Sequence, residues 1–357
     1  MISKLESQAL RGIAILGIIL HNYCHFLGQA VKENEYKFDA ARPVQFWDKL
    51  VSLDSDLFIH IFSFLGHYGV PIFLFISGYG LVKKYERGGV KPMSFLWQHF
   101  VKLFNLMIVG YLLFIAVWFL RHDDGMTVYS WDRVLAQLTM TVNFVYFEPN
   151  SIIKPGPYWY FGLMLQIYAL YVFVFHRWRS NALLYVTVLI AFAIQLALGL
   201  MDDARWLNFV RYNFIGGMLP FGMGLALARF ESKLVKDWVI TQSPSLIIIW
   251  AINLLLAITF CFMFSSRFDN WLWVPAFIVW GAIPVVKLMP ERVLNLFVWL
   301  GTISAAIFVT HPLVRKIFVR PYIQDDMYAG LLLYIVATLL MSWIIKQIID
   351  RIPSPKL

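Results

Sequence analysis

Three ionisable side chains stand in the first apolar stretch of the sequence, namely Arg11, His21 and His25. On a helix, ten residues at a rise of about 1.5 Å separate Arg11 from His21 by roughly 15 Å, which places Arg11 at the inner headgroup level and His21 near the bilayer midplane. His25 follows His21 by one turn on the same face. Ionisable groups inside a membrane span are costly and mark a functional site by default. A neutral imidazole can take a proton from a hydroxyl group, so proton transfer is one interpretation of the pattern. The alternative is that Arg11 reaches the lipid phosphates while His21 and His25 hydrogen-bond neighbouring helices.

The same two histidines have the i, i+4 spacing of paired metal ligands on one helix face. A metal site of that kind carries a glutamate directly after the first histidine, but the residues here are Asn22, Tyr23 and Cys24. Helix geometry also turns Cys24 away from the face of the histidines. We therefore expect acid–base chemistry at this position and no metal ion.

The composition of the chain predicts a membrane protein around these residues. Of the 357 residues, 60% are hydrophobic and 14% are charged, whereas soluble domains carry about 25% charged residues. Apolar runs long enough to cross roughly 30 Å of hydrocarbon as helices recur along the whole chain. The expected fold is an all-α integral membrane protein with about ten transmembrane helices, both termini cytoplasmic and a central cavity between the helices, in a single domain over residues 1–357.

The spans follow from the apolar runs between charged or Pro- and Gly-containing breaks. Helices are expected at residues 10–28, 57–82, 94–120, 158–175, 183–200, 213–228, 239–264, 271–287, 293–313 and 328–345. The stretch 135–147 is too short to span and is expected at the interface or as a re-entrant segment. Lys and Arg are denser in the loops assigned to the cytoplasm, and this distribution sets the orientation of the chain in the membrane. The net charge of +9 therefore reflects membrane orientation and predicts no nucleic-acid partner. The expected location is the inner (plasma) membrane.

Five blocks of sequence carry a family resemblance. They are Leu10-Arg11-Gly12-Ile13-Ala14 followed by His21, the glycine- and phenylalanine-rich residues 69–79, the partly basic residues 95–105, the tryptophan-containing residues 157–161, and residues 300–304 followed by Thr310-His311-Pro312. In this order the blocks resemble the membrane-bound acyltransferase-3 family of bacterial O-acyltransferases. Three departures are visible. The strict family position of the first-helix histidine falls on Asn22, the basic segment that ends in proline in the family reads His99, Lys102 and Asn105, and Met164 and Leu165 stand where glutamates are common.

The resemblance implies transfer of an acyl group, most often acetyl, from cytoplasmic acyl-CoA to a hydroxyl group of an extracytoplasmic glycan or a similar acceptor. A base would activate the hydroxyl, a donor would bind the thioester oxygen as it becomes anionic, and cations would bind the CoA phosphates. The candidate catalytic residues are His21, His25, Ser77 and Tyr79; the candidates for binding acyl-CoA are Arg11, His99, Lys102, Trp159 and Tyr160; and the candidates for binding the acceptor are Ser304 and His311.

A secondary transporter or flippase for a polar or glycolipid substrate is the alternative from another class of protein. Polar residues at the midplane of ten helices also describe many carriers, which are built from repeats with broken helices in paired positions. No such repeat is visible in this sequence. The enzyme hypothesis therefore leads, with acyl-CoA as the co-substrate and with membrane lipid and the hydroxyl acceptor as partners; a homo-oligomer is compatible with the sequence.

Overall fold

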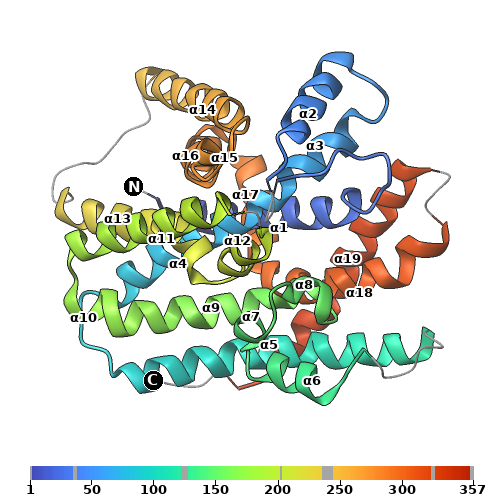
Figure 1. Ribbon diagram of the computed structural model, residues 1–357, viewed down its shortest axis with the longest axis horizontal. Helices are drawn as coiled ribbons and strands as arrows, with labels where there is room; N and C mark the ends of the chain where they lie inside the picture. Colours follow the sequence, from blue (N-terminus) through green and yellow to red (C-terminus); the bar gives the residue numbers. More distant parts are fainter. Residues whose placement is uncertain are drawn as a thin grey trace. The chain divides into compact units, whose positions relative to one another are not determined.

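The computed structural model describes residues 2–34, 38–121, 128–201, 203–234, 244–322 and 326–353 (Figure 1). Every element within these ranges is a helix, as the composition predicts. Six helices there are long and apolar enough to cross a membrane, and a bent pair raises the number to seven. They are Leu57–Tyr85, Pro92–Leu120, Gly156–Trp178, Asn181–Gly199, Ser245–Phe264 and Met327–Ile349, and the pair is Glu291–Thr302 with Ser304–Ile317. The chain is therefore a multi-pass membrane protein, and the count of ten spans stays a prediction.

The chain divides into two compact units. The first contains Met1–Gly88, Ser180–Leu200 and Gly217–Ser304. Its helices are α1 (Lys4–Cys24), α2 (Ala41–Ser52), α3 (Leu57–Leu65), the 3₁₀ turn η1 (Gly66–Tyr68), α4 (Gly69–Tyr85), α11 (Asn181–Gly199), most of α13 (Phe214–Leu234), α14 (Pro244–Phe264), α15 (Phe268–Trp271), α16 (Val274–Leu288) and α17 (Glu291–Thr302). The span expected at residues 239–264 corresponds to α14, and its first residues, 239–243, lie outside the described ranges.

The second unit contains Gly89–Arg179, Met201–Gly216 and Ala305–Leu357. Its helices are α5 (Pro92–Arg121), α6 (Trp131–Leu138), α7 (Val142–Val145), α8 (Pro149–Ile152), the turn η2 (Gly156–Tyr158), α9 (Trp159–Leu170), the π-helical segment η3 (Tyr171–Phe175), α10 (His176–Trp178), α12 (Ala204–Arg211), most of α18 (Ser304–Tyr322) and α19 (Met327–Ile349). The stretch expected to be too short to span, residues 135–147, forms parts of the short helices α6 and α7.

Helix α1 is defined at both ends by local hydrogen bonds. At its start, the backbone N–H of Glu6 donates to the Ser3 hydroxyl oxygen at 3.1 Å, and the Ser3 N–H donates to the Glu6 carboxylate at 2.7 Å, which completes a capping box. After its end, the Lys32 ammonium donates to the carbonyls of His25 and Leu27. A cation is favourable at a helix C-terminus because the last carbonyls carry partial negative charge. These contacts fix where α1 stops, directly before His25.

Helix α1 packs along α17 with the two backbones in direct contact. A Cβ atom added at Gly12 would lie 2.0 Å from the carbonyl oxygen of Phe297, so no larger residue fits there. The same α1 also packs against α3, η1 and α4, all within the first unit. Residues 57–82, expected as one helix, lie within the single span Leu57–Tyr85, which tightens to a 3₁₀ turn at η1. Along this span, α3 lies beside the carboxyl-terminal half of α1.

The span expected at residues 293–313 is not one straight helix, because α17 and α18 bend by 70° at Ile303. The hydroxyl of Thr302 donates to the carbonyl of Trp299 at 2.7 Å, and that of Ser304 donates to Gly301 at 2.8 Å. Side chains that bind nearby carbonyls compete with the helical ladder and favour such breaks.

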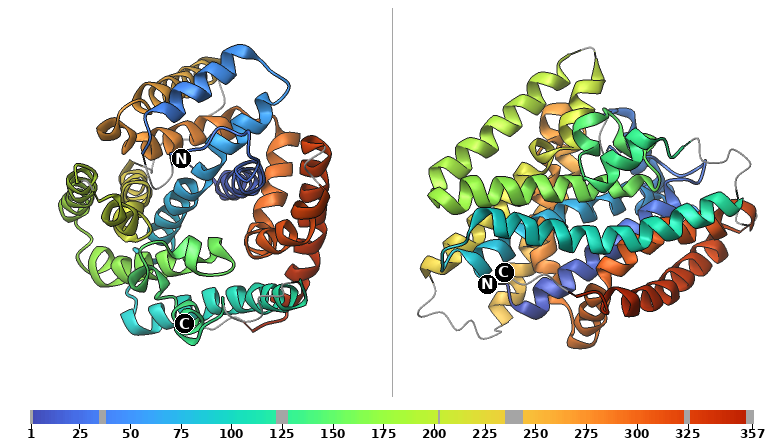
Figure 2. Two further views of the ribbon diagram at one scale, coloured as in Figure 1. Left: turned by 45° about the vertical axis from the view of Figure 1, so that its right-hand side comes forward. Right: turned by 90° about the horizontal axis from the view of Figure 1, so that it is seen from below.

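Helices α14 and α16 lie side by side in both ribbon views (Figure 2). The indole N–H of Trp280 donates to the amide oxygen of Asn253 at 3.0 Å and pairs the two helices. Nearly all side chains of α14 are exposed or only partly buried, and this helix has the highest mean hydropathy of the six spans. A helix that is apolar all round and unburied by protein faces lipid.

Candidate active site

His21 and His25 stand at the carboxyl end of α1, with ring centroids 5.1 Å apart. The Nδ1 atom of His21 donates to the backbone carbonyl of Ser63 on α3 at 2.8 Å, and the His21 side chain is buried. Nδ1 of His25 lies 2.7 Å from Oε2 of Glu33, and the His25 side chain is 33% exposed. The structure therefore confirms that the two imidazoles share one place, and it adds a carboxylate to them.

Glu33 belongs to the loop between α1 and α2, and no sequence motif marks it as functional. Its second oxygen, Oε1, lies 3.9 Å from Nε2 of His21, so the carboxylate faces both imidazoles. Burial acts to raise the pKa of Glu33, but the hydrogen bond with His25 and the charges of His21, His67 and His25 lower that pKa to about 2. The side chain is therefore a carboxylate at neutral pH.

The backbone next to Glu33 is held to α3 by two hydrogen bonds. The N–H of Val31 donates to Nδ1 of His60 at 3.2 Å, and the hydroxyl of Ser63 donates to the carbonyl of Val31 at 2.7 Å. Since the Ser63 carbonyl also accepts from His21, one residue of α3 positions both the histidine and the segment that carries Glu33.

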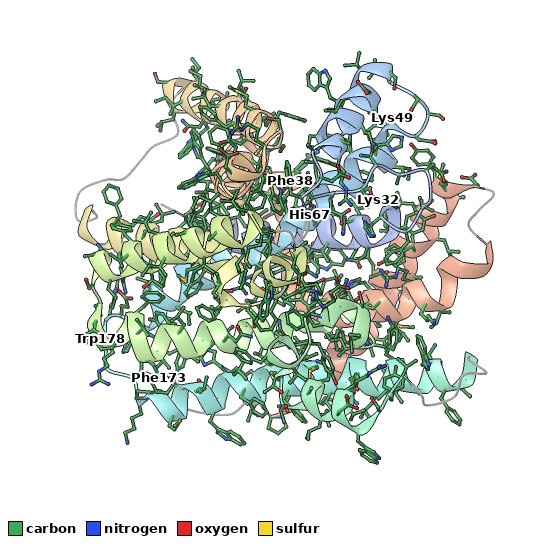
Figure 3. All side chains as sticks on the ribbon, in the orientation of Figure 1. Lys32, Phe38, Lys49, His67, Phe173 and Trp178 are labelled. Carbon is green, nitrogen blue, oxygen red and sulfur yellow. The ribbon has the colours of Figure 1, made fainter. Side chains whose placement is uncertain are left out.

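Two more histidines lie close to this cluster. The ring centroid of His67, in η1, lies 5.6 Å from that of His21 and 3.9 Å from that of Tyr68, to which the His67 ring is tilted by 37°. From sequence, His60 and His67 have no clear partner; the structure corrects this, because His60 orients the Glu33 loop and His67 joins the histidine cluster. Figure 3 labels His67 and, in the loop after α1, Lys32.

Gly66 sets the distance between η1 and α1. An added Cβ would lie 2.4 Å from the carbonyl oxygen of Gly17 and 2.7 Å from Cβ of His21, neither of which can rotate away. Gly66→Ala is therefore expected to displace His21, to cost about 1–3 kcal/mol of stability and to reduce acyl transfer roughly a hundredfold. The matched control is Gly80→Ala, whose Cβ would meet nothing within 4 Å. Thermal unfolding and CoA release measured on both variants check this; equal behaviour of the two would contradict it.

The remaining catalytic candidates lie at the other end of α1. The Tyr79 hydroxyl donates to the carboxylate of Glu231 at 2.6 Å and lies 3.0 Å from the carbonyl oxygen of Ile2. These contacts lie at the start of α1, roughly 25 Å along the helix from His21. Ser77, two residues earlier on α4, donates to the carbonyl of Phe73 at 2.8 Å. The structure does not bring Ser77 and Tyr79 to the histidines, so the geometry does not support their role as donors to the thioester oxygen. Arg11 is exposed between the two ends.

The other candidates for binding acyl-CoA belong to the second unit. His99 on α5 is buried, donates through Nδ1 to the carbonyl of Phe95 at 2.8 Å, and lies against the ring of Tyr168 at 4.4 Å. Lys102, one turn further on α5, is exposed. Trp159 and Tyr160 begin α9 with rings 6.0 Å apart. Helices α5 and α9 pack together, with His99 beside Tyr168 in the second half of α9, whereas Trp159 and Tyr160 stand at the start of α9.

A buried amide network holds the start of α9. The amide of Gln166 donates to Asn213 at 2.7 Å, and Asn213 donates to the carbonyl of Asn143 at 2.9 Å. Asn143 in turn donates to the carbonyl of Tyr212 at 2.6 Å, and the ring of Tyr212 meets Trp159 edge to face at 5.0 Å. The network ties α7, α9 and the end of α12 together and orients Trp159.

The two candidates for binding the acceptor are both buried. Ser304 closes the first unit, with its hydroxyl committed to Gly301. His311 lies in the second unit, where Nδ1 donates to the carbonyl of Ile307 at 3.2 Å. Within the described residues, Nε2 of His311 is buried without a hydrogen-bond partner. The ring of Phe308 lies between those of His311 and Tyr160, 5.9 Å and 5.4 Å from them.

The cluster at the end of α1 also has the composition of a two-histidine, one-carboxylate metal site. His21, His25 and Glu33 offer ligand atoms within 4.8 Å of one another. From sequence no carboxylate is expected there, and the loop supplies one. Two features favour proton transfer over a cation: His25 and Glu33 already form a hydrogen bond, and the Lys32 ammonium interacts with the same carboxylate. That no metal is used stays a prediction.

Comparison with known proteins gives one match. A family model described as an acyltransferase domain matches residues 5–347. No curated protein and no solved structure matches the chain. The matched residues extend from the first turn of α1 into the last turn of α19, so they include both compact units and all the candidate residues.

Proposed function

This chain belongs to the acyltransferase-3 family, and we propose that it transfers an acyl group, most often acetyl, from acyl-CoA to a hydroxyl group. That it is a membrane acyltransferase follows from the family and the spanning helices. The proposal adds the donor, the acceptor and the base. The acceptor is a glycan or a similar hydroxyl compound outside the cytoplasm, and the membrane is the inner membrane of a bacterial cell. Transport, the alternative class, has no support from the family match.

The observation that carries the proposal is the pair of imidazoles beside a buried carboxylate, His21 and His25 with Glu33. A carboxylate that faces a histidine orients its ring and stabilises the imidazolium that forms when the ring takes a proton. Such a base contributes about 10² to 10⁴ in rate.

Proton transfer in the proposed reaction balances on one imidazole. As the acceptor oxygen attacks the thioester carbonyl, the hydroxyl proton passes to a ring nitrogen of the histidine pair. The tetrahedral intermediate then loses the C–S bond, and the protonated histidine returns the proton to the CoA thiolate. The products are an O-acyl ester and free CoA, and the histidine is again neutral.

Exposed cations suit the phosphates of the donor. Arg11 in the first unit and Lys102 in the second are both exposed, and cations form charge-assisted hydrogen bonds with phosphate. Trp159 and Tyr160 supply aromatic surface. In the second unit, Nε2 of His311 is the proposed acceptor of a hydrogen bond from the hydroxyl compound.

The test is to supply purified protein in proteoliposomes with acetyl-CoA carrying a labelled acetyl group and with a panel of glycans and small alcohols. The expected result is label transferred to a hydroxyl compound as an alkali-labile ester, with an equal amount of free CoA. Transfer to amines only, or movement of an intact compound across the membrane without acyl transfer, would overturn the proposal.

A further inference from the structure

The loop residue Glu33 distinguishes between the two histidines. We infer that Glu33 is a positioning residue that fixes the ring tautomer of His25 and thereby makes His25, rather than His21, the base. This inference rests on the proposed function and names a residue that no motif of the sequence indicates.

The hydrogen bond to Glu33 decides where the hydrogen of His25 lies. An ionised carboxylate only accepts hydrogen bonds, so the contact of 2.7 Å between Oε2 and Nδ1 of His25 places the hydrogen on Nδ1. The lone pair of the neutral ring then sits on Nε2. Within the described ranges, Nε2 of His25 has no hydrogen-bond partner, and the side chain is 33% exposed. His25 therefore presents an accessible acceptor nitrogen to an incoming hydroxyl.

His21 is built differently. Its Nδ1 donates to the Ser63 carbonyl, so its lone pair is also on Nε2, but that atom faces Oε1 of Glu33 at 3.9 Å. The side chain of His21 is only 9% exposed. A hydroxyl that approached this nitrogen would have to enter beside the carboxylate. We therefore infer that His21 holds α1 against α3 and faces the Glu33 carboxylate, whereas His25 takes the proton.

The carboxylate is held in place by bonds on both sides of Glu33. Val31 is fixed to α3 through its N–H and its carbonyl, as described above. The carbonyl of Asn34 accepts from the indole N–H of Trp271 at 2.9 Å, and the carbonyl of Glu33 itself accepts from Arg42. A side chain whose backbone is pinned in this way keeps its geometry during the reaction.

The charges around the carboxylate are consistent with this role. Glu33 faces His21 and His25 from α1 and His67 from η1, and Lys32 interacts with it from the adjoining position. When His25 takes the proton of the acceptor, a carboxylate is already in contact with the new imidazolium. Glu33 itself neither gains nor loses a proton, because the hydroxyl proton enters at Nε2 and leaves to the CoA thiolate.

The test compares Glu33→Gln with Glu33→Asp in CoA release from acetyl-CoA, measured across pH. A glutamine amide can donate to Nδ1, which moves the ring hydrogen to Nε2 and removes the acceptor nitrogen. We expect Glu33→Gln to lower kcat about 10² to 10⁴-fold with KM for acetyl-CoA little changed. Because the imidazolium loses its counter-charge, the acid limb of the remaining pH–rate profile should move to lower pH. Glu33→Asp, which keeps the charge, should recover much of the rate.

The matched control is Asp48→Asn, which removes an exposed carboxylate from the neighbouring α2 and should leave rate and profile unchanged. Equal thermal unfolding of Glu33→Gln and wild type separates positioning from folding. Wild-type rate and profile in Glu33→Gln would overturn the inference and leave the proposed function standing. Loss of wild-type activity to a chelator, restored by Zn²⁺, would also overturn it in favour of a metal site. If wild type itself releases no CoA, it is the proposed function that fails.

Discussion

Replacement of His25 by alanine is expected to reduce CoA release about 10² to 10⁴-fold, because the variant has no nitrogen to take the acceptor proton. The loss should fall on kcat, since His25 lies in the cluster with Glu33 and acts during chemistry rather than in binding the donor. Steady-state CoA release in detergent measures it. His21→Ala removes the bond to Ser63 and should lower both activity and thermal stability, with the smaller effect on kcat.

The neighbouring Asn22 provides the control. Its amide donates to the carbonyl of Ile18 at 2.9 Å, and it occupies the position where the strict family pattern places histidine. Asn22→Ala should therefore retain near-wild-type kcat. If Asn22→Ala is inactive while His25→Ala is active, the assignment of the base to His25 is wrong.

Glu86→Ala should produce the largest loss of stability. The carboxylate of Glu86 accepts from Nη2 of Arg229 at 2.7 Å and from its Nε at 3.0 Å and 3.1 Å. The side chain of Glu86 is only 12% exposed and that of Arg229 only 6%. Removal of one partner leaves the other charge buried without its counter-ion, which typically costs about 3–5 kcal/mol. Thermal unfolding in detergent, with chemical denaturation for the free energy, checks this effect.

Two further variants serve as controls for the unfolding measurement on Glu86→Ala. Arg87→Ala removes an exposed cation from the adjacent position and should leave the unfolding midpoint unchanged. The double variant Glu86→Leu/Arg229→Met removes both charges and should recover most of the lost stability, since an apolar pair needs no counter-ion. An unfolding midpoint for Glu86→Ala equal to that of wild type would show that the pair does not stabilise the first unit.

The helices and their apolar character could be predicted from the sequence, because a membrane span is recognised by the length and hydropathy of its apolar run. The placement of His21 and His25 on one face of α1 follows from helix periodicity alone and is confirmed. Residue type and spacing were therefore sufficient to predict that the two imidazoles lie close together and to indicate the family.

Contacts that depend on loops and breaks could not be predicted in this way. Glu33 stands eight residues after His25 in a loop without a motif. Hydrogen bonds of Val31 with His60 and of Asn34 with Trp271 hold this loop so that the carboxylate lies beside the histidines. A signal was present in His60, because this histidine lies one turn into a span and needs a polar partner there. Sequence alone does not say which partner folds against it.

The bend between α17 and α18 is not predictable from the sequence for a related reason. The bend at Ile303 costs little where the hydroxyl groups of Thr302 and Ser304 satisfy nearby carbonyls, so the hydropathy pattern does not reveal it. The donor role expected of Tyr79 rested on its motif, whereas the close packing of α1 on α4 places that hydroxyl at the amino end of α1 with Glu231. Register between packed helices decides such contacts, and a single sequence does not display it.

The measurement that tests the central claim most directly is acetyl-CoA binding and free CoA release, recorded on the same sample of purified wild-type protein. The account predicts saturable binding of acetyl-CoA together with a slow release of CoA, even without the true acceptor, because water can replace the hydroxyl. A protein that neither binds acetyl-CoA nor releases CoA would contradict the account, and the search for an acceptor would become a search for a transported substrate.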